Sequence, residues 1–315
     1  MSGNNAGGSS RLASFTRTLA DEPRFLMLLP GLFWAGNAIV ARSVAGEVPP
    51  IALAFWRWTA AAILILPLAW RHLRVDAAVM AKNWPIMIVL TALGISIFNT
   101  FLYLGAQSTT ALNLVMLQTS MPVLVVLGSF LVFRETLTLR QAAGVVASLA
   151  GALTLVSHGD PEILIGLDFK RGDLWMLAAV VSYAAYTVLL RLRPPVHGPS
   201  FAFASFAFGA LLLLPFYIGE TLLVRPMPVT KNAFLAIGYV ALFASILAYL
   251  AFNRVAELRG ANTAGMIVYL VPVFGTILAV LLLGESLQAY HGLGIGLIAL
   301  GLWLATRKPA ISSSN

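Results

Sequence analysis

The chain has 315 residues, of which 59% are hydrophobic and only 10% are charged. A soluble domain carries about 25% charged residues, so this composition excludes a protein whose whole surface meets water. The 20 basic and 12 acidic residues give a net charge of +8, and the absence of cysteine excludes disulfides, thiolate metal sites and cysteine nucleophiles.

Long apolar segments follow a polar amino-terminal stretch. Residues 1–24 lack the apolar core of a signal peptide, and their Gly, Ser and Asn content predicts a disordered cytoplasmic tail. The apolar runs have about the 20-residue length that spans a bilayer as helix, and lipid leaves exposed backbone groups no other partner. We expect ten spans, at 25–42, 50–70, 84–106, 110–133, 138–157, 172–191, 199–219, 232–254, 261–283 and 287–306, before a cytoplasmic tail at 307–315.

The two halves of the chain repeat one another. Residues 120–137 read SMPVLVVLGSFLVFRETL, and residues 270–287 read LVPVFGTILAVLLLGESL. An offset of 150 pairs Pro122 with Pro272, Glu135 with Glu285, Gly144 with Gly294 and Gly151 with Gly301. Each half has five spans, and an odd number inserts the second half upside down. We therefore predict two inverted five-helix repeats, 25–157 and 172–306, with a connecting loop at 158–171, as in many secondary transporters.

The basic residues predict the orientation of the spans. If the amino terminus is inside, 14 of the 20 Lys and Arg residues lie in inner segments, five lie in outer segments, and Arg57 lies within a span. Cytoplasmic loops carry such an excess, so both termini should be cytoplasmic. The same excess in a soluble protein would raise nucleic acid as a partner, but here the charges orient helices, and we expect no nucleic acid.

The repeated motifs also carry a family resemblance. The two five-span halves, the run PVFGTILAVLLLGESL and the following HGLGIGLIALG resemble the drug/metabolite transporter superfamily, specifically its EamA-type members, and look most like the YddG-type aromatic amino-acid exporters. The resemblance implies an all-α membrane protein in which spans 1–4 and 6–9 surround a central cavity and spans 5 and 10 pack outside. Small residues four apart favour close packing of those outer spans: Ala143, Ala147 and Gly151, and Gly292 and Gly296.

The resemblance further implies a function and a location. We expect a secondary transporter of the cell inner (plasma) membrane that exports small organic solutes, above all aromatic or neutral amino acids and related metabolites, by alternating access. A nucleotide sugar, a sugar phosphate or a cationic drug is an alternative cargo on the same fold, and a non-transporting receptor is a more distant alternative. The expected partners are a small-molecule substrate and the lipid bilayer; the oligomeric state stays open.

Arg57, in FWRWTAA, is the one charged residue deep within an expected span. Arginine near the bilayer centre costs about 2.5–3.5 kcal/mol on insertion scales. The side chain either extends to the interface, bonds a helix-end carbonyl, or faces the cavity, where it could meet a substrate carboxylate. Trp56 and Trp58 should point about 100° to either side and therefore lie on other faces.

Uncharged polar and aromatic side chains form a second set of candidates. Buried amides and hydroxyls need partners, so each either bonds another helix or lines a watery cavity, while a tryptophan could also face lipid. With Arg57, the residues expected to line the cavity are Trp34, Asn37, Asn99, Tyr103, Gln118, Tyr183, Tyr186, Ser245, Tyr249, Met266 and Tyr269.

The paired prolines predict bends. Pro122 and Pro272 lack an N–H and would free the carbonyls of Gln118 and Val268, so the two helices should bend at equivalent points where gating could occur. The glutamates that follow, Glu135 and Glu285, are expected to cap the starts of spans 5 and 10.

The remaining titratable residues point away from catalysis. All acidic residues fall in loops or near span ends, which gives no support to a proton relay inside the membrane. The four histidines are scattered along the chain, and neither an HExxH motif nor paired carboxylates occur. We therefore expect no enzyme, no metal site and no cofactor.

Overall fold

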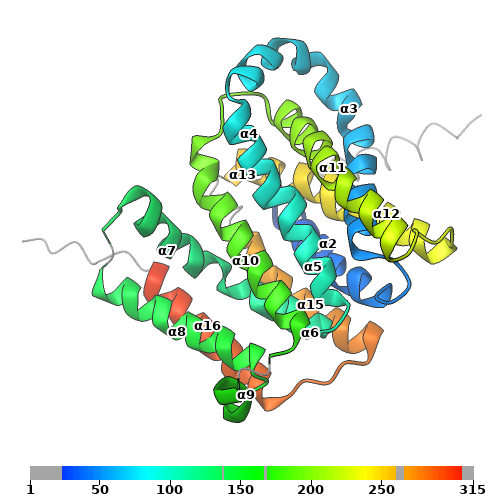
Figure 1. The fold of residues 1–315 in the computed structure, drawn as a ribbon. Coiled ribbons are helices and arrows are strands. Elements are labelled where there is room, and N and C mark those ends of the chain that lie inside the picture. The colour runs from blue at the N-terminus through cyan, green and yellow to red at the C-terminus, as the bar shows by residue number, and fades with distance from the viewer. Residues whose placement is uncertain (1–22, 137, 167–168, 260–265, 307–315) are drawn as a thin grey trace, which may run out of the picture.

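The computed structural model describes residues 23–136, 138–166, 169–259 and 266–306, and within them the chain is helical, with no strand (Figure 1). Most of the two expected tails lies outside the described residues. The first half contains α2 (Pro23–Ser43), α3 (Pro50–Lys82), α4 (Trp84–Thr91), the π-helix η1 (Ala92–Ile97), α5 (Phe98–Ala106), α6 (Ala111–Leu117), the 3-10 turn η2 (Gln118–Ser120), α7 (Met121–Phe133), α8 (Leu139–Val156) and α9 (Pro161–Gly166).

The second half repeats this order. It contains α10 (Arg171–Leu189), η3 (Leu190–Leu192), α11 (Gly198–Leu223), α12 (Lys231–Ala241), the π-helix η4 (Leu242–Leu247), α13 (Ala248–Arg259), the 3-10 turn η5 (Met266–Tyr269), α15 (Leu270–Leu283) and α16 (Ala289–Thr306). Among the described residues, eight helical segments are long and apolar enough to cross a membrane, and α15 and α16 are shorter apolar helices. The predicted all-α membrane fold is confirmed.

Local sequence explains where the helices begin and end. The hydroxyls of Thr110, Thr138 and Thr230 each accept the backbone N–H three residues later, which caps α6, α8 and α12. The second span is longer than the expected 50–70 because the stretch from Arg71 contains no glycine or proline before Pro85, so α3 continues to Lys82.

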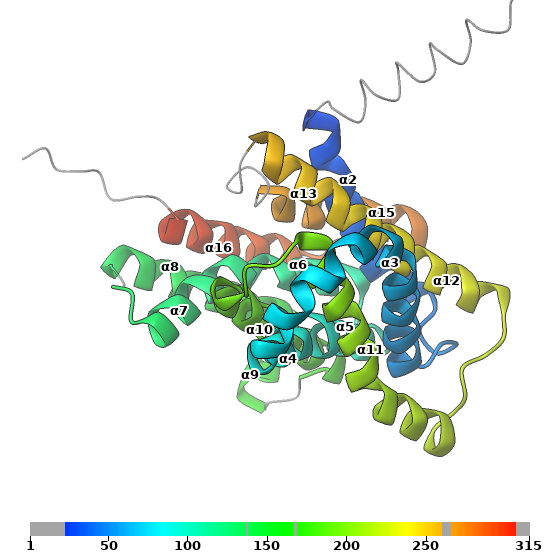
Figure 2. The ribbon, with the colours of Figure 1, turned by 90° about the horizontal axis from the view of Figure 1, so that it is seen from above.

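The helices form a bundle with two distinct ends. The turn between α3 and α4 lies at the top of Figure 1, and α9 lies at the bottom; we call these the α4 end and the α9 end. The antiparallel pairs α3 with α11 and α5 with α10 make extensive contacts, and α2 packs in parallel with α15, since both helices end at the α9 end. The pair α8 and α16 lies at one side of the bundle in both views (Figures 1 and 2), as expected for spans 5 and 10.

The two halves share a local irregularity that sequence reasoning missed. A π-helical turn interrupts the third span at Ala92–Ile97, and a second interrupts the eighth span at Leu242–Leu247, 150 positions later. Single π-turns within α-helices release carbonyls from the regular ladder and are frequent at functional sites. Their equivalent positions support the repeat and direct attention to the bundle interior between them.

The pairing of α8 with α16 follows the same symmetry. A Cβ at Gly151 would lie 2.6 Å from the carbonyl oxygen of Gly294, and a Cβ at Gly301 would collide with the carbonyl oxygen of Gly144. These are the four glycines matched by the repeat. In lipid, such close backbone approach supplies the packing that holds helices together. The prediction that Gly292 and Gly296 form the contact is wrong, because both face open space.

A carboxylate near the end of α11 caps the start of α3, and a carboxylate near the end of α3 caps the start of α11. Glu220, near the end of α11, accepts the backbone N–H groups of Ile51 (3.2 Å) and Ala52 (2.7 Å) at the start of α3. Asp76, near the end of α3, accepts the backbone N–H of His197 (3.2 Å) just before α11. Each carboxylate meets the positive end of a helix dipole, so the antiparallel pair is held at both ends.

Candidate functional site

Arg57 of α3 is buried inside the bundle, with 4% of its surface exposed. Its side chain does not extend to the interface, which was one of the open alternatives. The residues in contact with it come from α2, η4 and α5, so the guanidinium joins helices from both halves of the chain. A cation in this position needs a full set of acceptors, because an unpaired buried charge is costly.

Neutral acceptors meet two of the three guanidinium nitrogens. Nε donates to Ser245 Oγ at 2.9 Å, and Nη1 lies 2.7 Å from both Asn99 Oδ1 and Tyr103 Oη, and 3.0 Å from Asn37 Oδ1. Nη1 has only two hydrogens, and Tyr103 Oη donates to Asn37 Oδ1 at 2.9 Å. Nη1 therefore donates to Asn99 Oδ1 and Tyr103 Oη, and the tyrosine hydroxyl in turn donates to Asn37 Oδ1.

The third nitrogen, Nη2, has hydrogen-bonding capacity to spare. It carries two hydrogens, and the bond it donates is a long one of 3.4 Å to the carbonyl oxygen of Ala244. No ion pair in the described part of the chain includes Arg57. The site is thus a buried positive charge with dipolar partners and one nitrogen directed at a weakly satisfied position.

The two π-helices supply much of this polar surface. The carbonyl oxygen of Ile95 in η1 accepts from Trp58 Nε1 and from Asn99 Nδ2, both at 3.1 Å. In η4, Ser245 Oγ donates to the carbonyl oxygen of Val240 at 2.8 Å while it accepts from Arg57. These two bonds orient Asn99 and Ser245 toward the guanidinium.

Trp58 corrects an expectation about the faces of α3. The guanidinium carbon of Arg57 lies 4.4 Å from the centre of the Trp58 ring, a cation–π contact, although the two residues are adjacent in sequence. The long arginine side chain reaches across the helix surface, which the backbone angle alone does not predict. Trp56 behaves as expected: it points outward and donates to Tyr217 Oη at 3.3 Å.

The structure brings together five of the residues expected to line a cavity: Asn37, Arg57, Asn99, Tyr103 and Ser245. Others contact neighbouring helices. Trp34 packs on Phe252 at 5.8 Å and Tyr249 donates to the carbonyl of Gly198, whereas Gln118 donates to the carbonyl of Leu114 one turn earlier in its own span.

The rings of Tyr183 and Tyr186 pack together beside this group, with ring centres 5.2 Å apart; with Phe98 we call them the aromatic step. Phe98, which is on the same helix as Asn99, lies 4.7 Å from Tyr183. The side chains of Met266 and Tyr269 lie outside the described residues.

A short 3-10 turn lies just before the helix that contains each proline. In the fourth span, η2 separates α6 from α7, Pro122 lies in the first turn of α7, and the freed carbonyl of Gln118 accepts the N–H of Met121. In the ninth span, η5 precedes α15, which contains Pro272. The predicted bends at the two prolines and their use in gating stay a proposal.

The glutamates of the repeat do not cap the helices that follow them, so that expectation is wrong. Glu285 accepts the N–H groups of Ala111 and Leu112, both at 2.8 Å, and thus caps α6 across the interface between the halves. Glu135 pairs with Arg191 near the end of α10. Glu285 belongs to the α9 end and Glu135 to the α4 end.

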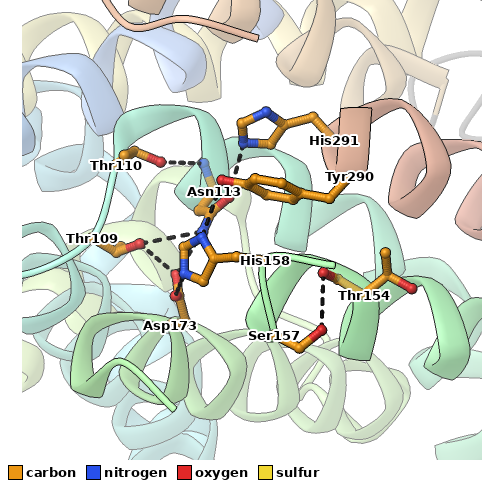
Figure 3. A network of polar contacts seen from close by, with 9 residues as sticks. All are labelled: Thr109, Thr110, Asn113, Thr154, Ser157, His158, Asp173, Tyr290 and His291. Atoms are coloured by element: carbon orange, nitrogen blue, oxygen red, sulfur yellow. Dashed lines mark hydrogen bonds and ion pairs between the residues drawn. The ribbon is translucent and has the colours of Figure 1, made fainter. Parts of the chain in front are cut away.

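A second polar cluster lies at the α9 end and includes residues that look scattered in the sequence (Figure 3). Asp173 is fully buried, accepts from Thr109 Oγ1, and accepts from Asn113 Nδ2 at 3.0 Å. His158 Nε2 lies 3.0 Å from Asp173, and His291 Nε2 lies 3.2 Å from Asn113 Oδ1. Asp173 occurs at the start of a span, a position that composition alone does not mark as buried.

Comparison with known proteins explains the two-fold construction. The family described as "EamA-like transporter family" matches residues 24–157 of this chain and, separately, residues 170–307. The chain belongs to this family. Because each match covers one half, the family unit corresponds to a five-helix repeat, and the sequence resemblance to EamA-type transporters is confirmed.

Full-length relatives of this EamA-type protein are named as transporters. An uncharacterized transporter of Archaeoglobus fulgidus is 29% identical, with 91% of this chain and 98% of that protein covered. The uncharacterized inner membrane transporter YedA of Escherichia coli K12 is also 29% identical, with 92% and 97% covered. The uncharacterized transporter YyaM of Bacillus subtilis is 25% identical, with 92% and 96% covered.

A solved crystal structure shares the fold, with a TM-score of 0.61 at 22% identity over 91% of this chain and 98% of the other. The EamA-type protein is therefore a multi-pass membrane transporter rather than an enzyme. As a transporter it acts on a small molecule within a lipid environment.

Proposed function

We propose that this EamA-type transporter exports small organic solutes that carry a carboxylate, with aromatic or neutral amino acids and related metabolites as the cargo, by alternating access. The observation that carries the proposal is the buried guanidinium of Arg57, which has no carboxylate partner among the described ion pairs and one weakly satisfied nitrogen. A carboxylate offers the acceptors that Nη2 lacks and neutralises the charge.

Electrostatics separates the alternative cargoes. Two unit charges 4 Å apart interact by about 4 kcal/mol at an effective dielectric constant of about 20. Repulsion of that size disfavours a cationic drug next to Arg57. A sugar phosphate or nucleotide sugar brings two or more negative charges, which one guanidinium leaves partly uncompensated. A solute with one carboxylate matches the single charge.

Aromatic rings beside Arg57 support an apolar part of the cargo. Trp58 lies under the guanidinium and packs on Phe206 with ring centres 4.9 Å apart, and the step of Phe98, Tyr183 and Tyr186 adds further ring surface. Aromatic side chains prefer offset or edge-to-face contacts with one another. We propose that the carboxylate bonds Arg57 and that the cargo side chain packs on these rings.

Two inverted halves supply the means of alternating access. The helices that contain Pro122 and Pro272 would bend in turn, opening one end of the bundle while the other stays closed. The contacts at the α9 end, where Glu285 and Asp173 both hold the start of α6, correspond to closure of that end.

The proposed location is the cell inner membrane, with both termini in the cytoplasm. The excess of Lys and Arg in the segments at the α4 end supports this orientation and would place the α9 end outside. The inner-membrane location in the name of YedA is in line with it.

Counterflow in proteoliposomes tests the proposal. Vesicles loaded with one unlabelled solute should accumulate the same labelled solute only if the protein carries it. The panel would contain phenylalanine, tryptophan, leucine, the amine phenethylamine, glucose 6-phosphate and a quaternary ammonium dye. We expect counterflow of the amino acids; counterflow confined to phenethylamine, the phosphate or the dye would overturn the cargo assignment, and none at all would overturn transport of these classes.

A further inference from the structure

Asp173 and His158 form a buried titratable pair that the Arg57 network does not use. Asp173 has no exposed side-chain surface, whereas 16% of the His158 side chain remains exposed. His158 therefore connects the buried carboxylate to the water at the α9 end. Figure 3 shows His158 between Asp173 and Tyr290, with Thr109 on the other side of the carboxylate and Asn113 above the imidazole.

The contacts define the protons that the cluster holds. With His158 neutral, Nε2–H donates to Asp173 Oδ2, and Nδ1, 3.1 Å from Tyr290 Oη, accepts the tyrosine proton. A proton added to Nδ1 reverses the bond to Tyr290 and turns the pair into an imidazolium beside a carboxylate. The buried negative charge is then compensated, so the closed cluster has a place for one more proton.

His291 cannot take that proton without losing a bond. Its Nδ1 accepts the backbone N–H of Gln288 at 2.9 Å, and its Nε2–H donates to Asn113 Oδ1, whose amide nitrogen faces Asp173. Both ring nitrogens of neutral His291 are therefore satisfied. Protonation of Nδ1 would place an N–H donor of the ring against the backbone N–H donor of Gln288.

The other charged groups at this end leave His158 as the partner of Asp173. From the end of α15, Glu285 is committed to the N–H groups of α6, and α6 itself contributes only neutral donors to the cluster. Lys170 and Arg171 lie at the start of α10 and are exposed. Asp160, before α9, and Glu162, on α9, are exposed as well. Arg42, at the end of α2, donates to the carbonyl of Ala106.

We propose that Asp173 and His158 form a proton-binding site that controls closure of the α9 end. The inference rests on alternating access, as proposed above. Asp173 and Glu285 come from the second half and hold the start of α6, in the first half, so closure requires their bonds. When this end opens, water replaces Asp173 as the partner of His158, and an imidazolium there loses the buried carboxylate that compensates its charge in the closed state.

Linkage then fixes the direction of the effect. A proton that prefers the closed state must favour closure by the same factor. Acid on the α9 side closes this end, and neutral to alkaline conditions release it. The proton enters and leaves from the same side, so the site resets the carrier toward the α4-open state without itself carrying charge across the membrane.

The absence of native cysteine allows a direct test on the full chain in nanodiscs. Spin labels at S108C and L287C, both exposed positions, would report the distance between the start of α6 and the end of α15. We expect the short-distance population to grow about fivefold or more, the low end of usual coupling factors, between about pH 8 and pH 5.5, the range in which histidine titrates.

Three variants make the test specific. H158Q keeps a hydrogen-bond donor but cannot be protonated, and D173N removes the charge, so the pH response should be lost in both. H197Q removes the histidine that contacts Asp76 at the α4 end, and this variant should keep the pH response. A wild-type distance that does not change with pH, or an unchanged response in H158Q, would overturn the proposal. The measurement needs no cargo and is independent of the proposed substrate.

Discussion

Arg57 donates from Nε to Ser245 Oγ at 2.9 Å, and this bond joins the second span of the first repeat to the π-helix of the second. Ser245 can meet the guanidinium because the π-turn displaces it from a regular helical register, and its own hydroxyl proton goes to the carbonyl of Val240. The bond places Arg57, the one buried lysine or arginine among the described residues, at the junction of the halves, where the proposed alternating-access mechanism needs its substrate site.

Replacement of Arg57 should abolish transport more than it affects folding. R57A removes the charge that binds the cargo and should lower counterflow of phenylalanine at least tenfold, because a charged hydrogen bond contributes about 1.5–3 kcal/mol. R57K keeps the charge but cannot serve Ser245, Asn99 and Tyr103 with a planar fork, so an intermediate loss is expected. Counterflow in proteoliposomes measures both.

W56F is the matched control for Arg57, because Trp56 is its neighbour but points outward. It should transport at the wild-type rate. Normal counterflow in R57A, with protein recovered in folded form, would contradict the assignment of the site.

The contact between α8 and α16 should not tolerate larger side chains at the matched glycines. G151V or G301V inserts atoms where neighbouring backbone oxygens lie, and overpacking of this kind costs about 1–3 kcal/mol. We expect a lower unfolding temperature in detergent for both variants. G292V provides the control, because a Cβ there meets nothing within 4 Å; equal destabilisation by all three would show that the symmetric packing is wrong.

Glu285 should determine how firmly the α9 end closes. E285Q leaves one carbonyl oxygen for two backbone donors and removes the favourable charge at the start of α6, a loss of about 1 kcal/mol. The long-distance population of the S108C/L287C pair should rise about fivefold at constant pH. E162Q, an exposed glutamate on α9, should leave the distances unchanged.

The proposed orientation predicts the reactivity of single cysteines in intact cells. A cysteine at Ser108 should react with a membrane-impermeant maleimide added outside, since the α9 end would face outward. A cysteine at Ala81, exposed near the end of α3, should react only after the membrane is permeabilised. The reverse pattern would place the termini outside.

The sequence predicted the part of the fold that the lipid environment imposes on each segment. Long apolar runs must be helices in lipid, and a duplicated pattern of prolines, glutamates and glycines indicates inverted halves. It also selected Arg57, because a lone cation in an apolar run is costly wherever it lies, and five of the expected cavity residues meet in one network. It failed on Glu285 and His291, since a residue near a span end can bond its own helix or a distant one.

The sequence by itself therefore determined the ten spans, their repeat and the anomalous arginine, because burial in lipid constrains each segment separately. Only the tertiary structure decided which polar groups meet. The π-turns at Ala92–Ile97 and Leu242–Leu247 were not found from the sequence, and they contain the Ile95 carbonyl and the Ser245 hydroxyl that take part in the Arg57 network. Asp173 and His158 likewise meet only when the segment after α8 packs on the start of α10, because hydrogen bonds act between neighbours in space.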